Sequence, residues 1–504
     1  MTARCLMVQG TASGVGKSLL TAALCRIFAR QGYRVAPFKS QNMALNAAVT
    51  VDGLEIGRAQ AAQAEAAGRE ATVDMNPILL KPERDDRSQV VVRGVAVGSL
   101  TFREYGARRA ELLGVVGESL ARVRATSDLV VIEGAGNPAE INLMAGEIVN
   151  MRIARLADAP VLLVGDIDRG GVFAAFVGTL SLLEPDDRAR VKGYVVNKFR
   201  GERALLEPGL QMVSALTGVP VLGVVPYLER GLVPAEDSLD LDDARPSSED
   251  GELDVAVVRL PRIANFDDVE PLAREPGVRV RFVTSPAELR SADLVILPGS
   301  KSTIADLVWL RNHGLADAIA LAPQRGTPVI GLCGGYQMLG TRLEDPDRIE
   351  SAVATAAGLG LLPVATTFAG AKQTVRVRGR ISANTGPWAG ARGREISGYE
   401  IHIGRTRRAN GEAPIAITER GGVPCNETDG ALGTDGMVIG TYLHGIFANS
   451  PLRAALLGWL ASRKGRAPDA RWGSSESAAA RYDRLADAVA AAIDVKAVAA
   501  LAGL

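Results

Sequence analysis

Cysteine, histidine and aromatic residues are scarce in this sequence. Its 504 residues include four cysteines and three histidines, and Phe, Trp and Tyr together make up 4%. The cysteines Cys5, Cys25, Cys333 and Cys425 are widely spaced and form no C-x-x-C pair, which argues against a zinc site, a redox couple or a disulfide framework. We therefore expect a protein of a reducing compartment.

Excess charge and long apolar runs are missing as well. Lys plus Arg and Asp plus Glu each number 57, so the electrostatic footprint of a nucleic-acid or membrane-surface protein is absent. No apolar run reaches the length of a membrane span, and the N-terminus does not read as a secretory signal. These absences predict a cytoplasmic globular protein that acts on small molecules, without nucleic-acid or membrane partners, and they leave its oligomeric state open.

The sequence does contain two successive alternations of apolar and amphipathic segments, which predict an α/β protein of two domains. Within residues 1–228 the runs CLMVQ, YRVAPF, DLVVIEG, PVLLVGDID, VKGYVVN and VPVLGVVPY predict a mostly parallel sheet covered on both faces. Its helices are expected over residues 17–30, 56–67, 105–124 and 204–216.

The rest of the chain divides into three parts. Residues 229–253 are too acidic and polar to bury, so they predict a linker. A second α/β domain is expected over residues 254–452, with strands in DVAVVRL, VRVRFV, DLVILPG and TPVIGL and further sheet candidates around 373–381 and 437–442. A C-terminal helical tail is expected over residues 453–504, with one or two closing helices in its alanine-rich part, residues 481–504.

A glycine-rich loop follows the first predicted strand and opens a helix, which is the context of a phosphate loop. Its glycines turn backbone N–H groups toward phosphate oxygens, Lys17 reaches the outer phosphates, and Ser18 is placed to ligate Mg²⁺. Five residues, rather than the usual four, separate Gly10 from Gly16. The residues expected to bind ATP are Gly10, Thr11, Ser13, Gly14, Val15, Gly16, Lys17, Ser18 and Asn197.

Polar residues end other strands at the same predicted sheet edge. Glu133 follows DLVVI, and we expect it to bind Mg²⁺ together with Ser18, although a solvated loop glutamate would give the same pattern. Asp166 and Asp168 follow another strand and face either substrate or metal. Asn197 either touches the nucleotide base or caps a turn.

Cys333 has the sequence surroundings of a nucleophile. The segment GLCGG lies between an apolar strand and a helix start, and it matches a nucleophile elbow with Cys in place of Ser. The small neighbours permit a tight turn, and a helix N-terminus favours a thiolate. A buried packing cysteine is the alternative, but it has no need of three glycines within two residues.

A cysteine nucleophile needs a base, and the chain has three histidines that could serve as one. His444 follows an apolar strand and is the predicted base, His402 is its rival, and His313 is expected to cap or solvate a helix end. Gly299 ends a further strand, and we expect it to supply one oxyanion N–H group while Gly334 supplies the other.

Phrases spread over nearly the whole chain resemble the cobyric acid synthase family, the glutamine-hydrolysing amidases of cobalamin biosynthesis. They include GTASGVGKS, PFKSQNMALN, EIGRAQAAQAEAAG, EGAGNPAEINL, DIDRGGVFA, IANFDD, GLCGGYQMLG, GYEIHIG and YLHGIF. The first half is similar to dethiobiotin synthetase-type ATPases, and the second half is similar to class I glutamine amidotransferases.

The resemblance implies a reaction and a substrate. Cys333 would attack the side-chain amide of glutamine with His444 as base, while ATP activates a carboxylate of adenosylcobyrinic a,c-diamide, whose b, d, e and g carboxylates become amides. Many class I members carry a glutamate two residues after the histidine, but Ile446 occupies that position here. A Cys–His dyad is therefore expected, and Glu400 is a guess for the group that orients the histidine.

Two alternatives and one set of substrate contacts stay open. Cobyrinic acid a,c-diamide synthase has similar domains but amidates the a and c positions, and DIDRGG, NKFRG and PFKSQNM look less like it. A non-catalytic ATP-dependent switch with a vestigial amidotransferase domain is opposed by the intact cysteine and histidine. Lys39, Lys81 and Arg169 are candidates to contact the corrin carboxylates, although most basic side chains merely face solvent.

Overall fold

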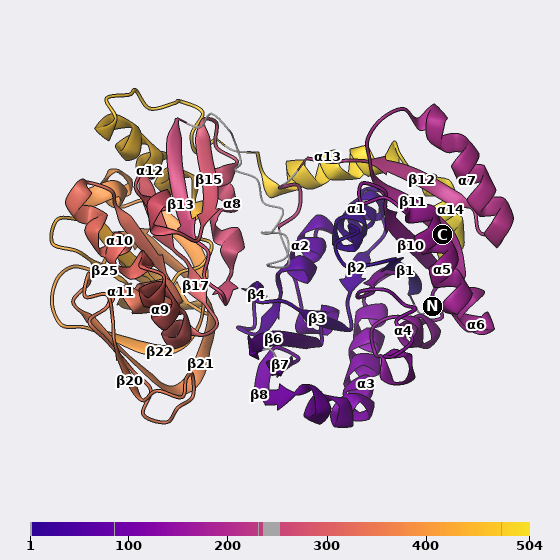
Figure 1. Cartoon of the computed structure of the whole chain (residues 1–504), viewed down its shortest axis with the longest axis horizontal. Helices are drawn as coiled ribbons and strands as arrows, with labels where there is room; N and C mark the ends of the chain where they lie inside the picture. Colours follow the sequence, from indigo (N-terminus) through magenta and orange to yellow (C-terminus); the bar gives the residue numbers. More distant parts are fainter. Residues whose placement is uncertain (1–2, 85, 230, 235–251, 475) are drawn as a thin grey trace. The chain divides into compact units, whose positions relative to one another are not determined.

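The computed structural model describes residues 3–84, 86–229, 231–234, 252–474 and 476–504, and the chain falls into two compact units (Figure 1). Unit 1 comprises Met1–Ala44, Ile56–Ala235 and Glu476–Leu504. Unit 2 comprises Leu45–Glu55 and Glu236–Ser475. Most of the predicted linker, residues 229–253, lies outside the described residues. The α/β class predicted from the sequence is confirmed in both units.

Unit 1 is built on a six-stranded parallel sheet in the order β12-β11-β10-β1-β9-β2. Each strand coincides with a predicted apolar run, because a strand covered on both faces needs apolar side chains along its whole length. Parallel pairing brings the carboxyl ends of β9, β1, β10 and β11 to one edge. The strands are β1 (Arg4–Gly10), β2 (Val35–Phe38), β9 (Leu129–Glu133), β10 (Val161–Asp166), β11 (Val191–Phe199) and β12 (Val221–Pro226).

Helices cover both faces of this sheet. One face shares an apolar core with α1, α2, α13 and α14, whereas α5 packs on the other face, where Phe176 stacks on Tyr194 with ring centroids 4.5 Å apart. The four helices predicted from the sequence are confirmed, α1 with the same bounds. The helices are α1 (Lys17–Arg30), α2 (Arg58–Ala66), α3 (Phe102–Ala125), α4 (Met151–Ala157), α5 (Val172–Leu182), α6 (Pro185–Arg188), α7 (Arg203–Thr217), α13 (Ala478–Ala490) and α14 (Val495–Ala502). Across the described residues, none of the helices combines the length and the apolar character needed to cross a bilayer.

A second, four-stranded sheet in unit 1 was not anticipated from the sequence. It has the order β3-β6-β7-β8, with antiparallel pairing between β6, β7 and β8. The first four residues of the last strand are exposed, and its sequence VAVGSLT shows no alternation of apolar and polar residues. The strands are β3 (Gln41–Met43), β6 (Ile78–Arg84), β7 (Arg87–Val92) and β8 (Val95–Thr101).

Unit 2 contains another six-stranded sheet, in the order β15-β13-β16-β18-β26-β25, which is parallel except for β25. Its strands are β13 (Leu253–Val258), β15 (Val278–Val283), β16 (Leu294–Leu297), β18 (Val329–Leu332), β25 (Ala431–Leu432) and β26 (Val438–Thr441). A separate sheet is organised by the long antiparallel pair β21 (Val364–Ile381) and β22 (Glu395–Arg408). The predicted strands of the second domain are all found in these two sheets.

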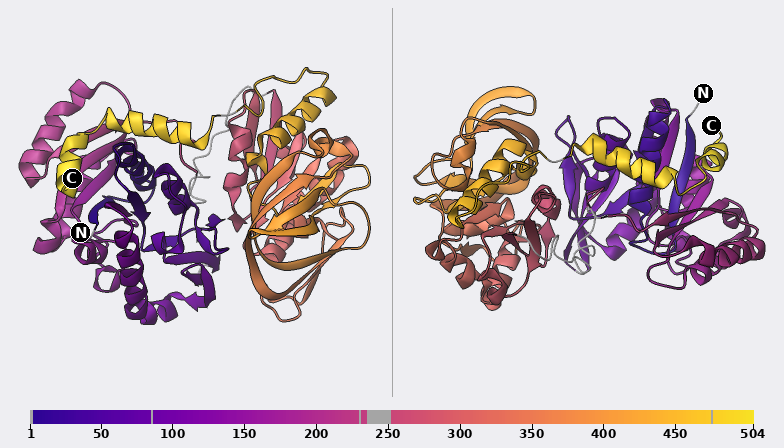
Figure 2. Two further views of the ribbon diagram at one scale, coloured as in Figure 1. Left: turned by 180° about the vertical axis from the view of Figure 1, so that it is seen from behind. Right: turned by 90° about the horizontal axis from the view of Figure 1, so that it is seen from above.

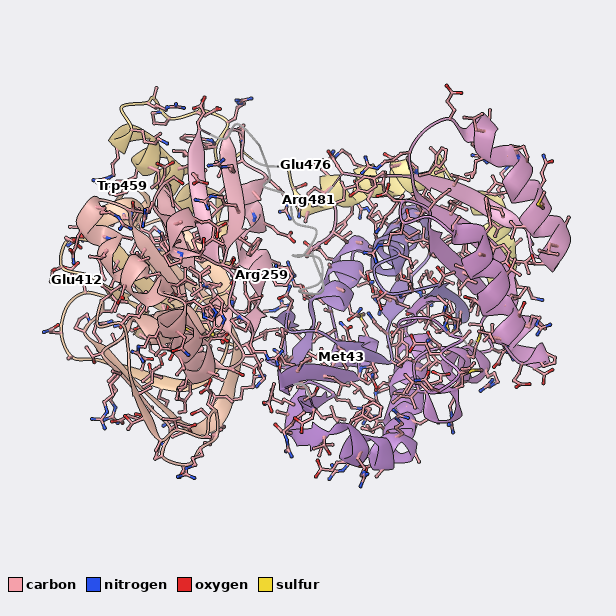
Figure 3. All side chains as sticks on the ribbon, in the orientation of Figure 1. Met43, Arg259, Glu412, Trp459, Glu476 and Arg481 are labelled. Carbon is pink, nitrogen blue, oxygen red and sulfur yellow. The ribbon has the colours of Figure 1, made fainter. Side chains whose placement is uncertain are left out.

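The C-terminal residues are divided between the two units. Helix α12 (Ser450–Arg463), which carries Trp459, buries Leu456 in the core of unit 2 (Figure 3). Glu476 and Arg481 lie at the start of the next helical segment, α13, which packs beside α1 in unit 1 (Figures 2 and 3). The residues of the predicted helical tail, 453–504, are thus divided between two units, because their apolar side chains pack in two separate cores.

Leu485 on α13 tests how firmly the end of the chain is anchored in unit 1. Its side chain is fully buried against the core around α1. We expect Leu485→Ala to lower the free energy of unfolding of unit 1 by about 2–5 kcal/mol, because it leaves a cavity. The matched change Leu205→Ala, at an 80% exposed position on α7, should shift it by no more than about 0.5 kcal/mol. Urea denaturation followed by circular dichroism measures both, and equal effects would contradict the anchoring.

Candidate active site

Cys333 lies at a tight turn between β18 and the short helix α11 (Gly334–Leu339) in unit 2. Its φ of 49° and ψ of −107° place it in a region that residues other than glycine rarely adopt, at a cost of about 1–3 kcal/mol. A side chain on Gly335 would overlap the carbonyl oxygen of Leu297, so glycine is required for the turn to pack against β16. This is the strand–turn–helix geometry expected of a nucleophile elbow.

His444 is the histidine that the fold brings to Cys333. It follows β26, the sheet neighbour of β18, and its imidazole lies close enough to the Cys333 side chain for the two groups to interact electrostatically. The backbone N–H of Cys333 donates to Thr441 O at 2.8 Å, which fixes the elbow to the strand that carries the histidine. Both side chains are buried, at 7% exposure for Cys333 and 2% for His444.

Asp268 orients this histidine, which the sequence analysis missed. His444 Nδ1 lies 2.7 Å from Asp268 Oδ2, and the other carboxylate oxygen accepts a hydrogen bond from Gly445 N at 2.7 Å. Asp268 lies in the 3-10 segment Phe266–Val269, 176 residues before its partner. The expected Cys–His dyad is therefore wrong, since the three side chains form a Cys–His–Asp arrangement. The pair of aspartates at the end of IANFDD is the feature of the sequence that could have indicated this residue.

The other candidates for these roles have different partners. Glu400 accepts a hydrogen bond from Arg420 Nη1 at 2.5 Å and lies 3.4 Å from His402 Nε2, so the guess that it orients His444 is wrong. His402 uses its second ring nitrogen on a backbone carbonyl two residues further along, 2.8 Å away. His313 is exposed and lies 2.9 Å from the carbonyl oxygen of Trp309, which confirms the predicted capping of a helix end.

Charge pairing sets the protonation state of His444. Burial alone lowers its pKa, but the Asp268 carboxylate and the Cys333 side chain outweigh burial and raise the pKa from its ordinary 6.5 to about 10. The imidazole is therefore protonated at neutral pH. An imidazolium beside a cysteine side chain can act as the general acid of the site.

The two glycines predicted to form an oxyanion hole lie beside the elbow. A side chain on Gly299, in β17 (Gly299–Ser300), would begin 3.3 Å from His444 Cε1. A side chain on Gly334 would begin 2.8 Å from Ser300 N. Because both positions exclude any side chain, backbone N–H groups can approach a reacting carbonyl here; donation to an oxyanion stays a prediction.

The predicted phosphate loop occupies the carboxyl edge of the parallel sheet in unit 1. Gly16 has a φ of 97°, and a side chain there would overlap Asn197 Nδ2, so both backbone and space require glycine. Lys17 Nζ donates to Ala12 O at 2.9 Å and to Gly136 O at 3.3 Å, which holds the ammonium across the loop. The predicted strand–loop–helix context is thus present.

Glu133 is buried at this edge, so it is not a solvated loop residue. Ser18 Oγ and Lys39 Nζ each lie 2.9 Å from Glu133 Oε1, and Gln63 Nε2 lies 2.5 Å from Oε2. The two predicted metal ligands are therefore neighbours. The sequence analysis missed Gln63 and considered Lys39 only as a corrin contact, and these two residues flank residues 45–55 in the sequence.

The remaining polar residues at this edge brace the loop. Asn197 Nδ2 donates to Val15 O at 2.8 Å, and contact with a nucleotide base stays a prediction. Asp166 accepts from Lys198 Nζ at 2.8 Å, and the same ammonium donates to Gly14 O at 2.8 Å. In the part of the chain that the structure describes, no three His, Cys, Asp or Glu side chains are grouped as metal ligands.

Removing the Asp268 carboxylate should change the pH dependence of the site. In Asp268→Asn the pKa of His444 should fall well below about 10, because burial, which lowers it, is then opposed by Cys333 alone, so the imidazolium would be lost at a lower pH. We expect glutamine hydrolysis at pH 8 to fall about 10²-fold and the alkaline limb of the kcat/KM profile to move to lower pH. Initial rates of glutamate release from pH 5 to 11 measure both effects.

Glu400→Gln is the matched control for this prediction. It removes a carboxylate that is equally buried in unit 2 but pairs with His402 and Arg420. The alkaline limb of the kcat/KM profile of Glu400→Gln should lie at the same pH as that of the unchanged chain. A shift with Glu400→Gln and none with Asp268→Asn would contradict the assignment of Asp268.

Known proteins match this chain in both halves. The family model described as CobQ/CobB/MinD/ParA nucleotide binding domain matches residues 6–237, and the CobB/CobQ-like glutamine amidotransferase domain matches residues 254–452. A cobyric acid synthase of Sorangium cellulosum is 57% identical over 98% of both chains. A cobyric acid synthase of Dehalococcoides mccartyi strain CBDB1 is 50% identical over 99% of both chains. Another, from Pelotomaculum thermopropionicum, is 51% identical over 100% of this chain and 97% of the relative. With both family domains present and full-length identity of this order, the chain belongs to the cobyric acid synthase family.

Proposed function

We propose that this chain is an ATP-dependent, glutamine-hydrolysing ligase that converts the b, d, e and g carboxylates of adenosylcobyrinic a,c-diamide into amides. The observation that carries the glutaminase half is the Cys333–His444–Asp268 arrangement at a nucleophile elbow. Family membership supports the corrin substrate. The four cysteines are free, which fits a cytoplasmic enzyme.

In the glutaminase reaction, the Cys333 thiolate attacks the side-chain amide carbon of glutamine. The C–N bond breaks as the imidazolium of His444 donates a proton to the leaving nitrogen, which departs as ammonia. His444, now neutral, takes a proton from the water that attacks the thioester, and glutamate is released with the thiolate regenerated. Asp268 holds the imidazole in the orientation that both proton transfers require.

The phosphate loop is suited to the activation of a carboxylate. Its backbone N–H groups and Lys17 orient the triphosphate, so that a substrate carboxylate takes the γ-phosphoryl group and becomes an acyl phosphate. Ammonia then attacks the acyl carbon, and phosphate leaves. A hydroxyl and a carboxylate oxygen 2.9 Å apart, from Ser18 and Glu133, fit the ligand preference of Mg²⁺, which would neutralise phosphate charge.

The proposal predicts that the two half-reactions can be separated by one substitution. Cys333→Ala should abolish glutamine-dependent amidation and keep amidation driven by ammonium chloride, because ammonia supplied from solution bypasses the thiolate. Purified protein is incubated with ATP, Mg²⁺ and adenosylcobyrinic a,c-diamide, and the corrin is followed by mass spectrometry. Loss of both activities in a folded Cys333→Ala protein would contradict the division into two half-reactions.

The same assay decides the substrate. Stepwise amidation at b, d, e and g, located by fragmentation or NMR, is the expected result for the unchanged chain. Amidation at a and c of cobyrinic acid would instead identify a cobyrinic acid a,c-diamide synthase. Consumption of ATP and glutamine without any change in either corrin would overturn the corrin assignment and leave the glutaminase assignment standing.

A further inference from the structure

Segment Leu45–Glu55 comes from the nucleotide-binding half of the sequence but is part of unit 2. Its strand β4 (Ala47–Val49) is buried and pairs with β5 (Glu55–Gly57). The turn between them is closed by Thr50 N, which donates to Leu54 O at 2.9 Å. The strand is therefore buried, whereas Val51 and Asp52 in the turn are exposed.

One set of contacts joins this segment to the turn that carries Asp268. Asn265, at a φ of 51°, accepts from Ala47 N at 3.2 Å and donates to Ala47 O at 3.3 Å. The side chain of Asn46 accepts from Phe266 N at 3.2 Å. The backbone N–H of Asp268 in turn donates to Asn265 O at 3.1 Å, so the segment holds the start of the Asp268 turn by three hydrogen bonds.

A second set of contacts joins the segment to Tyr399, which packs on the catalytic histidine. The Tyr399 hydroxyl donates to Ala47 O at 3.1 Å and accepts from Asn265 Nδ2 at 3.3 Å. The Tyr399 ring stacks on His444 with centroids 5.4 Å apart, and its backbone exchanges hydrogen bonds with that of His444 at 2.9 and 3.2 Å. Ala47 O is therefore shared by the residue behind His444 and the residue that begins the Asp268 turn.

The far end of the segment is fixed independently. Glu55 is buried and pairs with Lys372 on β21 at 2.5 Å. On the same strand, Arg376 Nε donates to Val49 O at 2.9 Å. An element held at both ends in this way presents its Ala47 carbonyl at a constant position.

We propose that Leu45–Glu55 is a positioning element of the glutaminase centre, which through Ala47 holds Tyr399 and Asn265 so that His444 and Asp268 stay aligned with Cys333. Tyr399 and Asn265 touch no reacting atom in this role; they act through the histidine and the aspartate. The inference rests on the proposed glutaminase function. It identifies a determinant of that activity that lies within the nucleotide-binding family domain, about 200 residues before the amidotransferase domain begins.

The test uses the full chain and two conservative substitutions. Tyr399→Phe keeps the ring on His444 and removes the hydroxyl, and Asn265→Gly keeps the left-handed backbone and removes the side-chain contacts. Each should lower kcat for glutamine hydrolysis about tenfold with little change in KM, because misalignment affects the reaction more than binding. The alkaline limb of kcat/KM should also move to lower pH, as the imidazolium loses its aligned carboxylate.

Tyr482→Phe is the matched control, because it removes a buried tyrosine hydroxyl that bonds Glu65 in unit 1. Its glutaminase rate and pH profile should equal those of the unchanged chain, and all variants should keep ammonium-driven amidation. If Tyr399→Phe behaves like Tyr482→Phe, or loses ammonium-driven amidation in parallel, the positioning role is overturned. If the unchanged chain releases no glutamate from glutamine, the proposed function itself fails.

Discussion

The buried Asp268–His444 pair is the interaction on which the glutaminase centre depends. A carboxylate and an imidazole at 2–3% exposure would each be costly to bury alone, and they are tolerated because the charges lie 2.7 Å apart and the second carboxylate oxygen has its own donor. Since the pKa of His444 is raised, the pair stabilises the folded chain fully below pH 6.5 and loses this contribution as pH rises through about 10. The same pairing holds an imidazolium beside the nucleophilic sulfur.

Charge pairing also organises the other site. Glu133 is almost fully buried, and it is held there by Lys39, Gln63 and Ser18. A carboxylate fixed in this way is presented at the edge of the sheet where the phosphate loop begins, which the parallel order of the strands dictates. In both units, therefore, a parallel sheet supplies the location and a buried ion pair supplies the orientation of the functional side chain.

The order of the chain does not follow the order of the units. The chain leaves unit 1 shortly after Lys39, contributes Leu45–Glu55 to unit 2, and returns before Gln63. Its last helices, α13 and α14, return again to cover the sheet formed by the first strands. As a result, one short stretch of sequence contains two of the three residues that hold Glu133, Lys39 and Gln63, and between them the backbone that contacts Tyr399.

The sequence by itself determined the α/β class, the apolar strands of both parallel sheets, the phosphate loop and the cysteine elbow. Each of these depends on residues within about ten positions of one another, namely apolar runs or glycines at fixed spacing. The tertiary structure alone decided the partners. Asp268 lies 176 residues from His444 and Lys39 lies 94 from Glu133, and nothing local distinguishes the aspartate in NFDD from the glutamate in YEIH. Long-range packing likewise decided to which unit residues 45–55 and the C-terminal helices belong. The apolar and polar pattern of a segment indicates which of its side chains are buried, but not which core they pack in.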